Sequence, residues 1–228
     1  MKRVELLTVA AGLMIASSVA SAAIISYTFT ADGVTDSISQ QATAVFAFDS
    51  ANVNSFTITL TDNVQPTGSL ESVLTGLSFS LSNAPATMAL DSASAASVIN
   101  CAGGTNPCPA GSGSSPYGWG STFADGTFLL GAGYTDGSFA YQPYGIVNAN
   151  YTASALSDPG ANPLLVGPVT FTVHLTGLAF TPEVNSVVFA FGDPILQQAV
   201  AVPEPQSVAL VALGLLAAAF ALRRRNRT

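Results

Sequence analysis

The body of this chain carries short stretches in which hydrophobic and polar residues alternate. In "SFTITLTD", residues 55–62, Phe56, Ile58 and Leu60 alternate with three threonines. Successive side chains of a β-strand point to opposite faces of its sheet, so this period of two predicts a strand with one buried and one exposed face. The stretches that predict strands in this way are residues 24–33, 42–50, 55–62, 76–83, 169–177 and 186–193.

These strands predict an all-β fold, an antiparallel β-sandwich of the jelly-roll-like or Ig-like kind. No charged amphipathic helix of useful length interrupts them. Residues 100–162 are rich in Gly, Pro, Ser and Asn and show weak periodicity, which predicts long loops. The Asp-Gly pairs at 32–33, 125–126 and 136–137 predict tight turns.

The N-terminal segment predicts export. "MKRVELLTVAAGLMIASSVASA" has a basic start, an apolar stretch and a small-residue end of the A-x-A type. This order is typical of a signal peptide, here residues 1–22, cleaved between Ala22 and Ala23 after passage through Sec-type export machinery.

The C-terminal segment, residues 202–228, predicts a membrane anchor behind a body of residues 23–201. Residues 206–222 are 17 uncharged positions, enough for a short transmembrane helix of about 25 Å. Pro203 and Pro205 mark the boundary of that helix, because proline does not continue a helix inward. The cluster behind the helix stays on the cytoplasmic side by the positive-inside rule. Its members are Arg223, Arg224, Arg225 and Arg227.

Pro203, Glu204 and Pro205, followed by a short apolar helix and an arginine cluster, resemble the PEP-CTERM sorting signal of Gram-negative bacteria. The resemblance implies that an exosortase, a membrane-embedded transpeptidase-like enzyme, recognises the Pro-Glu-Pro motif and cleaves nearby. It also implies an inner-membrane intermediate that is later released to the cell surface or the extracellular matrix. Stretches of the body, such as "VTFTVHLTGLAF", resemble an uncharacterised group of PEP-CTERM surface proteins, for which no catalytic residues are implied.

The charge distribution excludes several classes of function. All six basic residues lie at the two ends of the chain, and none lies between Val4 and Leu222. Eleven of the 13 acidic residues lie in residues 23–201, which gives this segment a formal charge of −11. Nucleic-acid binding needs Lys or Arg against the phosphates, so the body has no nucleic-acid partner.

The two cysteines predict a structural disulfide. Cys101 and Cys108 lie within a short stretch of turn-forming residues, "CAGGTNPC". In an exported protein this arrangement favours a local disulfide, whereas a redox CxxC motif has two intervening residues and a zinc site needs four ligands.

Three hypotheses for function follow, and the first is preferred: a non-enzymatic surface or matrix protein associated with exopolysaccharide or biofilm, with no cofactor. The second is a carbohydrate-binding module, which requires an exposed coplanar platform from Tyr117, Trp119 or Tyr144. The third is an extracellular hydrolase, in which the single histidine, His174, or a Glu71–Glu183 pair lines a pocket. Calcium suits a body without basic residues, but no EF-hand pattern is present, so no metal site is assigned.

Overall fold

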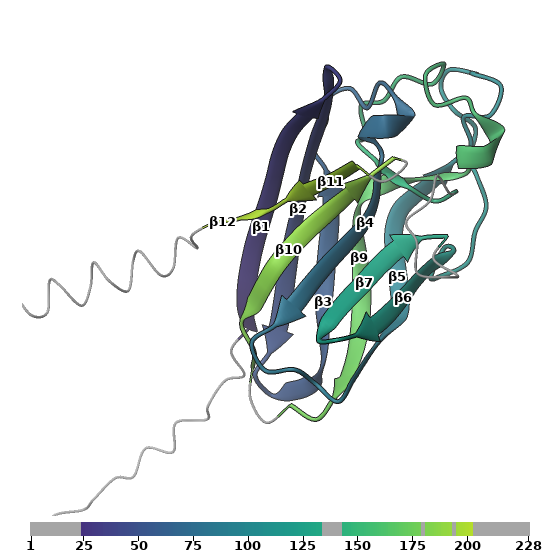
Figure 1. Ribbon diagram of the computed structural model, residues 1–228. Helices are drawn as coiled ribbons and strands as arrows, with labels where there is room; N and C mark the ends of the chain where they lie inside the picture. Colours follow the sequence, from purple (N-terminus) through teal and green to yellow (C-terminus); the bar gives the residue numbers. More distant parts are fainter. Residues whose placement is uncertain (1–23, 134–142, 179–180, 193–194, 203–228) are drawn as a thin grey trace, which may run out of the picture.

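The computed structural model describes residues 24–133, 143–178, 181–192 and 195–202 (Figure 1). Within these residues the regular structure consists of twelve β-strands and two short 3-10 helices. The elements are β1 (Ile24–Thr35), β2 (Ile38–Asp49), β3 (Asn52–Asp62), η1 (Leu70–Ser72), β4 (Leu74–Leu81), β5 (Thr87–Ile99), β6 (Trp119–Ala124), β7 (Thr127–Ala132), β8 (Ile146–Val147), η2 (Pro159–Ala161), β9 (Leu164–Thr176), β10 (Val184–Phe191), β11 (Ile195–Gln198) and β12 (Val200–Val202).

Backbone hydrogen bonds join the strands into a single sheet in the order β11-β10-β4-β8-β9-β3-β2-β1-β12. Strand β5 pairs with β9, and the β6–β7 hairpin pairs with β4 through β7. The sheet folds over so that β10, β4, β7 and β6 lie in front of β1, β2, β3, β9 and β5 (Figure 1). The all-β prediction is therefore confirmed, and the assignment to a jelly-roll-like or Ig-like sandwich stays a prediction.

Aromatic side chains fill the space between the two layers. Phe79 of β4 lies with its ring centroid 4.9 Å from that of Phe46 of β2 and 6.1 Å from that of Phe56 of β3. At the β6 side, Trp119 lies 4.7 Å from Phe171 of β9. Such pairs add packing energy to the burial of their large apolar surfaces. The inward positions predicted by the alternation in β3, β4, β9 and β10 are all buried in this core.

Two segments close the sides of the folded sheet. On one side β11 pairs with β10 and β12 pairs with β1, with Ala199 between them. On the other side, Ser121 and Ser115 accept hydrogen bonds from the backbone N–H groups of Leu90 and Ala93 in β5. These two backbone N–H groups of the edge strand β5 are therefore not available for pairing with a strand of another chain.

The structure corrects two predictions, one on the loops of residues 100–162 and one on the turn at residues 32–33. Residues 100–162, predicted as loops, contain the β6–β7 hairpin and the short strand β8. The pair 125–126 makes the predicted turn of that hairpin, with positive φ at Asp125 and Gly126. The pair 32–33 makes no turn, because it lies inside β1, and the β1–β2 turn falls instead at Asp36 and Ser37.

Candidate functional site

The β1–β2 turn, η1 and η2 lie at one end of the sheet, the end at the top of Figure 1. We call this region the loop end. It contains a buried carboxyl group, a small polar pocket and the disulfide.

The buried carboxyl group belongs to Asp62, the last residue of β3. Its side chain is fully buried, since Phe56, Ile58, Leu60 and Asp62 all lie on the inner face of the strand. The Asp62 Oδ1 atom accepts a hydrogen bond of 2.9 Å from the backbone N–H of Val64, and Oδ2 accepts one of 3.0 Å from the Thr67 hydroxyl. Asp62 thereby fixes the turn that leads out of the core.

Burial raises the pKa of the Asp62 carboxyl from its ordinary value of 3.8 to about 7. The loss of hydration on burial disfavours the charged form, and the hydrogen bonds from Val64, Thr67 and Asn148 oppose this only in part. The segment 23–201 holds no Lys or Arg that would compensate the charge. Asp62 therefore changes its protonation state near neutral pH.

Thr67 connects Asp62 to the neighbouring loop. Its hydroxyl, which donates to Asp62, also accepts a hydrogen bond of 3.0 Å from the backbone N–H of Asn148. Its backbone N–H donates to the carbonyl of Asn150, and its carbonyl accepts from the N–H of Thr152. Residues 62–67 and 148–152 are consequently held together as one hydrogen-bonded unit.

A pocket of about 270 Å³ lies between the β1–β2 turn and η1. We call it the serine pocket. Hydroxyl and amide side chains line it, together with the apolar groups of Ile38, Val64 and Pro66. Its polar side chains are Ser37, Ser39, Gln65, Ser69 and Ser72.

Ser69 is the unusual member of this pocket. It occupies the N-cap position of η1, where a serine hydroxyl ordinarily accepts a backbone hydrogen bond, but it makes no such bond. Its hydroxyl oxygen is buried and has no hydrogen-bond partner among the described residues. A buried hydroxyl without a partner is unfavourable in the free protein.

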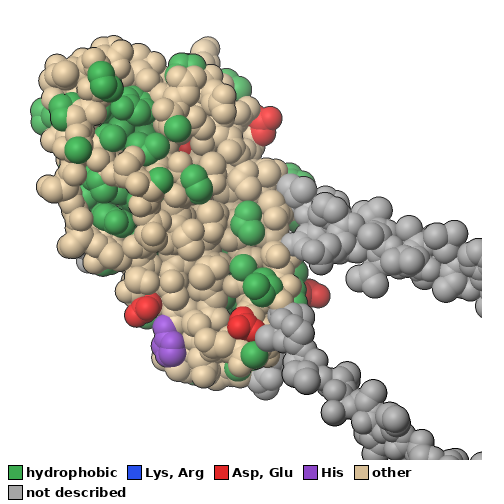
Figure 2. Space-filling view, turned by 180° about the vertical axis from the view of Figure 1, so that it is seen from behind, with side chains coloured by type: hydrophobic (Ala, Val, Ile, Leu, Met, Phe, Trp, Pro, Cys, Tyr) green, Lys and Arg blue, Asp and Glu red, His purple; other side chains and the backbone are tan. Residues whose placement is uncertain are grey.

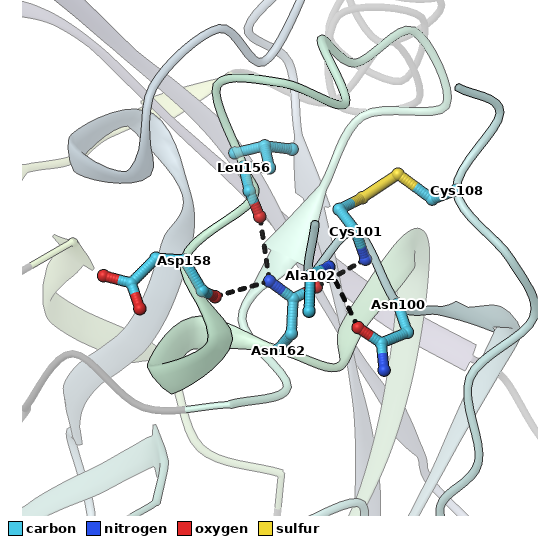
Figure 3. Close-up of a disulfide and its surroundings, with 7 residues drawn as sticks. All are labelled: Asn100, Cys101, Ala102, Cys108, Leu156, Asp158 and Asn162. Atoms are coloured by element: carbon cyan, nitrogen blue, oxygen red, sulfur yellow. Dashed lines mark hydrogen bonds between the residues drawn. A yellow bond between two sulfur atoms is a disulfide. The ribbon is translucent and has the colours of Figure 1, made fainter. Parts of the chain in front are cut away.

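The disulfide between Cys101 and Cys108 is present, as predicted (Figure 3). Both cysteines are buried in a second, smaller hydrophobic cluster with Val73, Leu156 and Leu164. The side chain of Asn162 lies beside the bridge and accepts a hydrogen bond of 2.7 Å from the backbone N–H of Cys101. Its amide nitrogen donates to the carbonyls of Leu156 and Asp158. The disulfide closes the loop that follows β5, and Asn162 joins that loop to the segment that precedes β9.

Replacing both Cys101 and Cys108 by Ala should lower the free energy of unfolding. Closing this eight-residue loop contributes about 2.5 kcal/mol in the chain-entropy model. Urea unfolding of the wild-type protein with and without reductant measures the effect, and the double variant serves as the control that reductant should not change. Equal midpoints for oxidised and reduced wild-type protein would contradict the prediction.

The aromatic residues proposed as a sugar platform do not form one. Trp119 is buried at 3% exposure and its indole N–H donates to the carbonyl of Tyr144. The rings of Tyr117 and Tyr144 are tilted by 40° to each other at 6.5 Å, and both pack against the main core. These aromatic groups therefore pack against and cover the core, rather than forming a coplanar surface.

The candidate hydrolase residues are not brought together either. His174 is exposed on β9 between Ser55 of β3 and Ala89 of β5, at the end of the molecule opposite the loop end (Figure 2). Glu183 precedes β10, whereas Glu71 in η1 lies against Gly192, just after β10. The eight residues of β10 separate the backbone positions of the two glutamates by about 25 Å along the strand, far beyond the spacing of up to about 9.5 Å that glycosidase carboxylates use.

No group of three or more His, Cys, Asp or Glu side chains that could hold a metal ion occurs within the described ranges. The same ranges contain no helix long and apolar enough to cross a membrane. Four predicted features lie wholly outside the described residues: the signal cleavage position at Ala22 and Ala23, the motif Pro203, Glu204 and Pro205, the helix 206–222 and the arginine cluster. Ile24 and Val202 begin and end the described body.

Sequence comparison identifies the C-terminal segment as a targeting element. Residues 201–225 match the family model described as the PEP-CTERM protein-sorting motif. The chain is thus an exported protein with a sorting signal of the exosortase-substrate kind. No curated protein and no solved structure matches the chain. The matched segment begins within β12, so the sorting motif follows the folded body without a linker.

The prediction from sequence missed Asp62 and Ser69. A signal for Asp62 was present, because its position continues the inward alternation of Phe56, Ile58 and Leu60. An aspartate is almost never fully buried unless its carboxylate is paired, so Asp62 could have been predicted as a candidate site residue from its inward position. No local pattern distinguishes Ser69 from the many other serines of the chain.

Proposed function

We propose that this protein is a non-enzymatic component of the cell surface or extracellular matrix, sorted by an exosortase and retained by exopolysaccharide or biofilm material. The observation that carries the proposal is the PEP-CTERM motif at residues 201–225, directly behind the last strand of the body. A β-sandwich body of the jelly-roll-like or Ig-like kind would be the functional part that remains after processing.

The route to the surface is part of the proposal. Residues 1–22 act as a signal peptide for Sec-type export, and cleavage leaves Ala23 as the first residue. Residues 206–222 then hold the protein in the inner membrane with its body outside and Arg223 to Arg227 in the cytoplasm. Processing near Pro203, Glu204 and Pro205 releases it from this anchor.

The surface chemistry of the body supports a role in a hydrated matrix. The face in Figure 2 is mostly uncharged, with scattered acidic side chains and no Lys or Arg. Threonines and serines occupy the outward positions of β3, β4 and β9. A net negative charge keeps such a protein soluble and away from acidic surfaces, while its hydroxyl groups suit hydrogen bonding to neutral polysaccharide. The separation of His174, Glu71 and Glu183 favours this role over the extracellular hydrolase.

The intact mass of the protein in the inner-membrane, surface, matrix and medium fractions of its host tests the proposal. We expect a species that begins at Ala23 and ends near Pro203 to Pro205, enriched in the surface or matrix fraction. Enzymatic removal of the polysaccharide should release this species into the medium. A mass that retains the arginine cluster, confined to the inner membrane, would contradict sorting. A processed species found in the medium before polysaccharide removal would contradict retention by the matrix.

A further inference from the structure

We infer that the serine pocket at the loop end binds one ring of a neutral carbohydrate. The inference rests on the proposed matrix function for its biological setting, but its argument comes from the pocket itself. With a volume of about 270 Å³, the pocket lies just below the range of about 300–1,000 Å³ that accommodates drug-sized ligands. It therefore has room for a single small ring and not for an extended chain.

The charge of the lining selects a neutral ligand. No acidic or basic side chain lines the pocket, and residues 23–201 contain no Lys or Arg. An anionic ligand would find no opposite charge here and would be repelled by the acidic body. A cationic ligand would find no carboxylate in the lining to pair with.

The lining also has the two-sided character that a sugar ring requires. Ser37, Ser39 and Gln65 supply donors and acceptors for ring hydroxyls. Val64 and Pro66 supply apolar surface for the C–H groups of the ring. A mainly apolar ligand would leave the hydroxyls of the pocket without partners, which is costly.

Ser37 and Ser39 present the hydroxyl groups that a ligand can reach. Both residues are exposed, whereas the Ser69 hydroxyl oxygen is closed to solvent and is therefore out of reach of a ligand in the pocket. Ser37 lies in the β1–β2 turn and Ser39 in β2, so both belong to one wall of the pocket. A ring hydroxyl bound at this wall would exchange hydrogen bonds with these side chains in place of water.

The pocket is also held in shape before any ligand binds. Val64, in its wall, is fixed by the hydrogen bond to Asp62, and Thr67 joins the same segment to Asn148. On the other side, the Ser72 hydroxyl donates to the carbonyl of Ser69 over 2.7 Å. A preformed site loses little conformational entropy on binding.

A second pocket of about 270 Å³ provides an internal comparison. It lies around the β2–β3 turn, and Asp49 and Asn52 line it together with Ser55. It contains a carboxylate, and none of its lining side chains has a buried polar atom without a partner. Because its volume is similar but its lining carries a charge, this pocket serves as the control for the serine pocket.

The test measures binding of glucose, galactose and mannose methyl glycosides to the protein as it is recovered from its host, by saturation-transfer NMR. Glucuronate serves as the anionic probe. Ser39→Ala removes an exposed hydroxyl of the lining, so it should not destabilise the fold. Gly68→Leu fills the pocket at a position where an added Cβ would meet only the Pro66 carbonyl oxygen, at 3.6 Å. Ser94→Ala on β5, an exposed serine far from the pocket in the sheet order, is the matched control.

We expect at least one neutral glycoside to bind the wild-type protein and Ser94→Ala equally. Binding should weaken about three- to tenfold in Ser39→Ala, the loss of one hydrogen bond, and vanish in Gly68→Leu. Equal binding by all four proteins, preferential binding of glucuronate, or loss of binding on Asn52→Leu at the second pocket would overturn the inference.

Fractionation of the same variants separates this inference from the proposed function. If no glycoside binds the wild-type protein while it still remains in the matrix, the pocket assignment is wrong and the matrix function stands. If glycosides bind as expected but the protein is found only in the medium, the pocket stands and retention by the matrix is wrong.

Discussion

Replacing Glu204 by Ala in the full chain will leave the protein unprocessed in the inner membrane. Glu204 is the charged residue of the Pro-Glu-Pro motif, within the matched sorting segment 201–225. Proline restricts its own backbone and that of the residue before it, and the motif places a single carboxylate between two such residues. Loss of that carboxylate removes the charged feature by which a processing enzyme can distinguish this short stretch. We expect the processed species to fall at least tenfold.

Intact mass and immunoblotting of the fractions measure this effect. Glu183→Ala is the matched control, because it removes an exposed glutamate of the same charge from the folded body. It should be processed like the wild type. Normal processing of Glu204→Ala would show that the motif is only a boundary before the predicted helix.

Replacing Asp62 by Asn should remove a large part of the pH dependence of stability. The folded pKa of Asp62 is raised to about 7 from 3.8, so between these values the folded state holds a proton that the unfolded state has lost. The free energy of unfolding of the wild type therefore falls as pH rises through this range. The shift of about three units corresponds to about 4 kcal/mol. The fold is accordingly expected to be more stable at pH 5 than at pH 8.

Asn fits the hydrogen bonds of this position at every pH. Its Oδ1 can accept from Val64, as Asp62 does now, and its amide can donate to the Thr67 hydroxyl. Urea unfolding between pH 4 and pH 8.5 should show a flatter profile and a higher free energy of unfolding than the wild type at pH 8. Asp49→Asn is the matched control. The Asp49 carboxylate likewise accepts a hydrogen bond from the backbone N–H two residues later, that of Ala51, but Asp49 is exposed. A wild-type slope in the Asp62→Asn variant would contradict the assignment.

The strands were best predicted from the sequence where neighbouring residues differ strongly in hydrophobicity. In β3 and β9, large apolar residues alternate with threonine, so the buried face is evident from the side chains alone. Strand β5 was missed because Ala and Ser fill most of its positions and differ little in hydrophobicity. It forms because β9 offers it a long antiparallel partner, with register shifts at Leu90/Ser92 and Ala95/Ser97 that interrupt any regular period.

The candidate site was less predictable than the strands, because it depends on contacts across the sequence. The serine pocket combines the β1–β2 turn with residues that follow β3, and Thr67 is joined to Asn148 from a distant loop. The disulfide was predictable, because its two cysteines are close in sequence and no others compete for pairing. The hypothesis of an exposed platform at Tyr117, Trp119 and Tyr144 failed because the composition of a loop does not show which of its side chains are buried.

The direction of β12 determines how the described chain leaves the body. Strand β12 runs antiparallel to β1, with Val200 opposite Thr30 and Val202 opposite Thr28. The chain therefore leaves the body heading toward the Ile24 end of β1, away from the β1–β2 turn and the loop end (Figure 1). In the unprocessed protein of the proposed route, the chain toward the anchor would thus start in the direction away from the serine pocket, and the pocket would be open to ligands before and after processing.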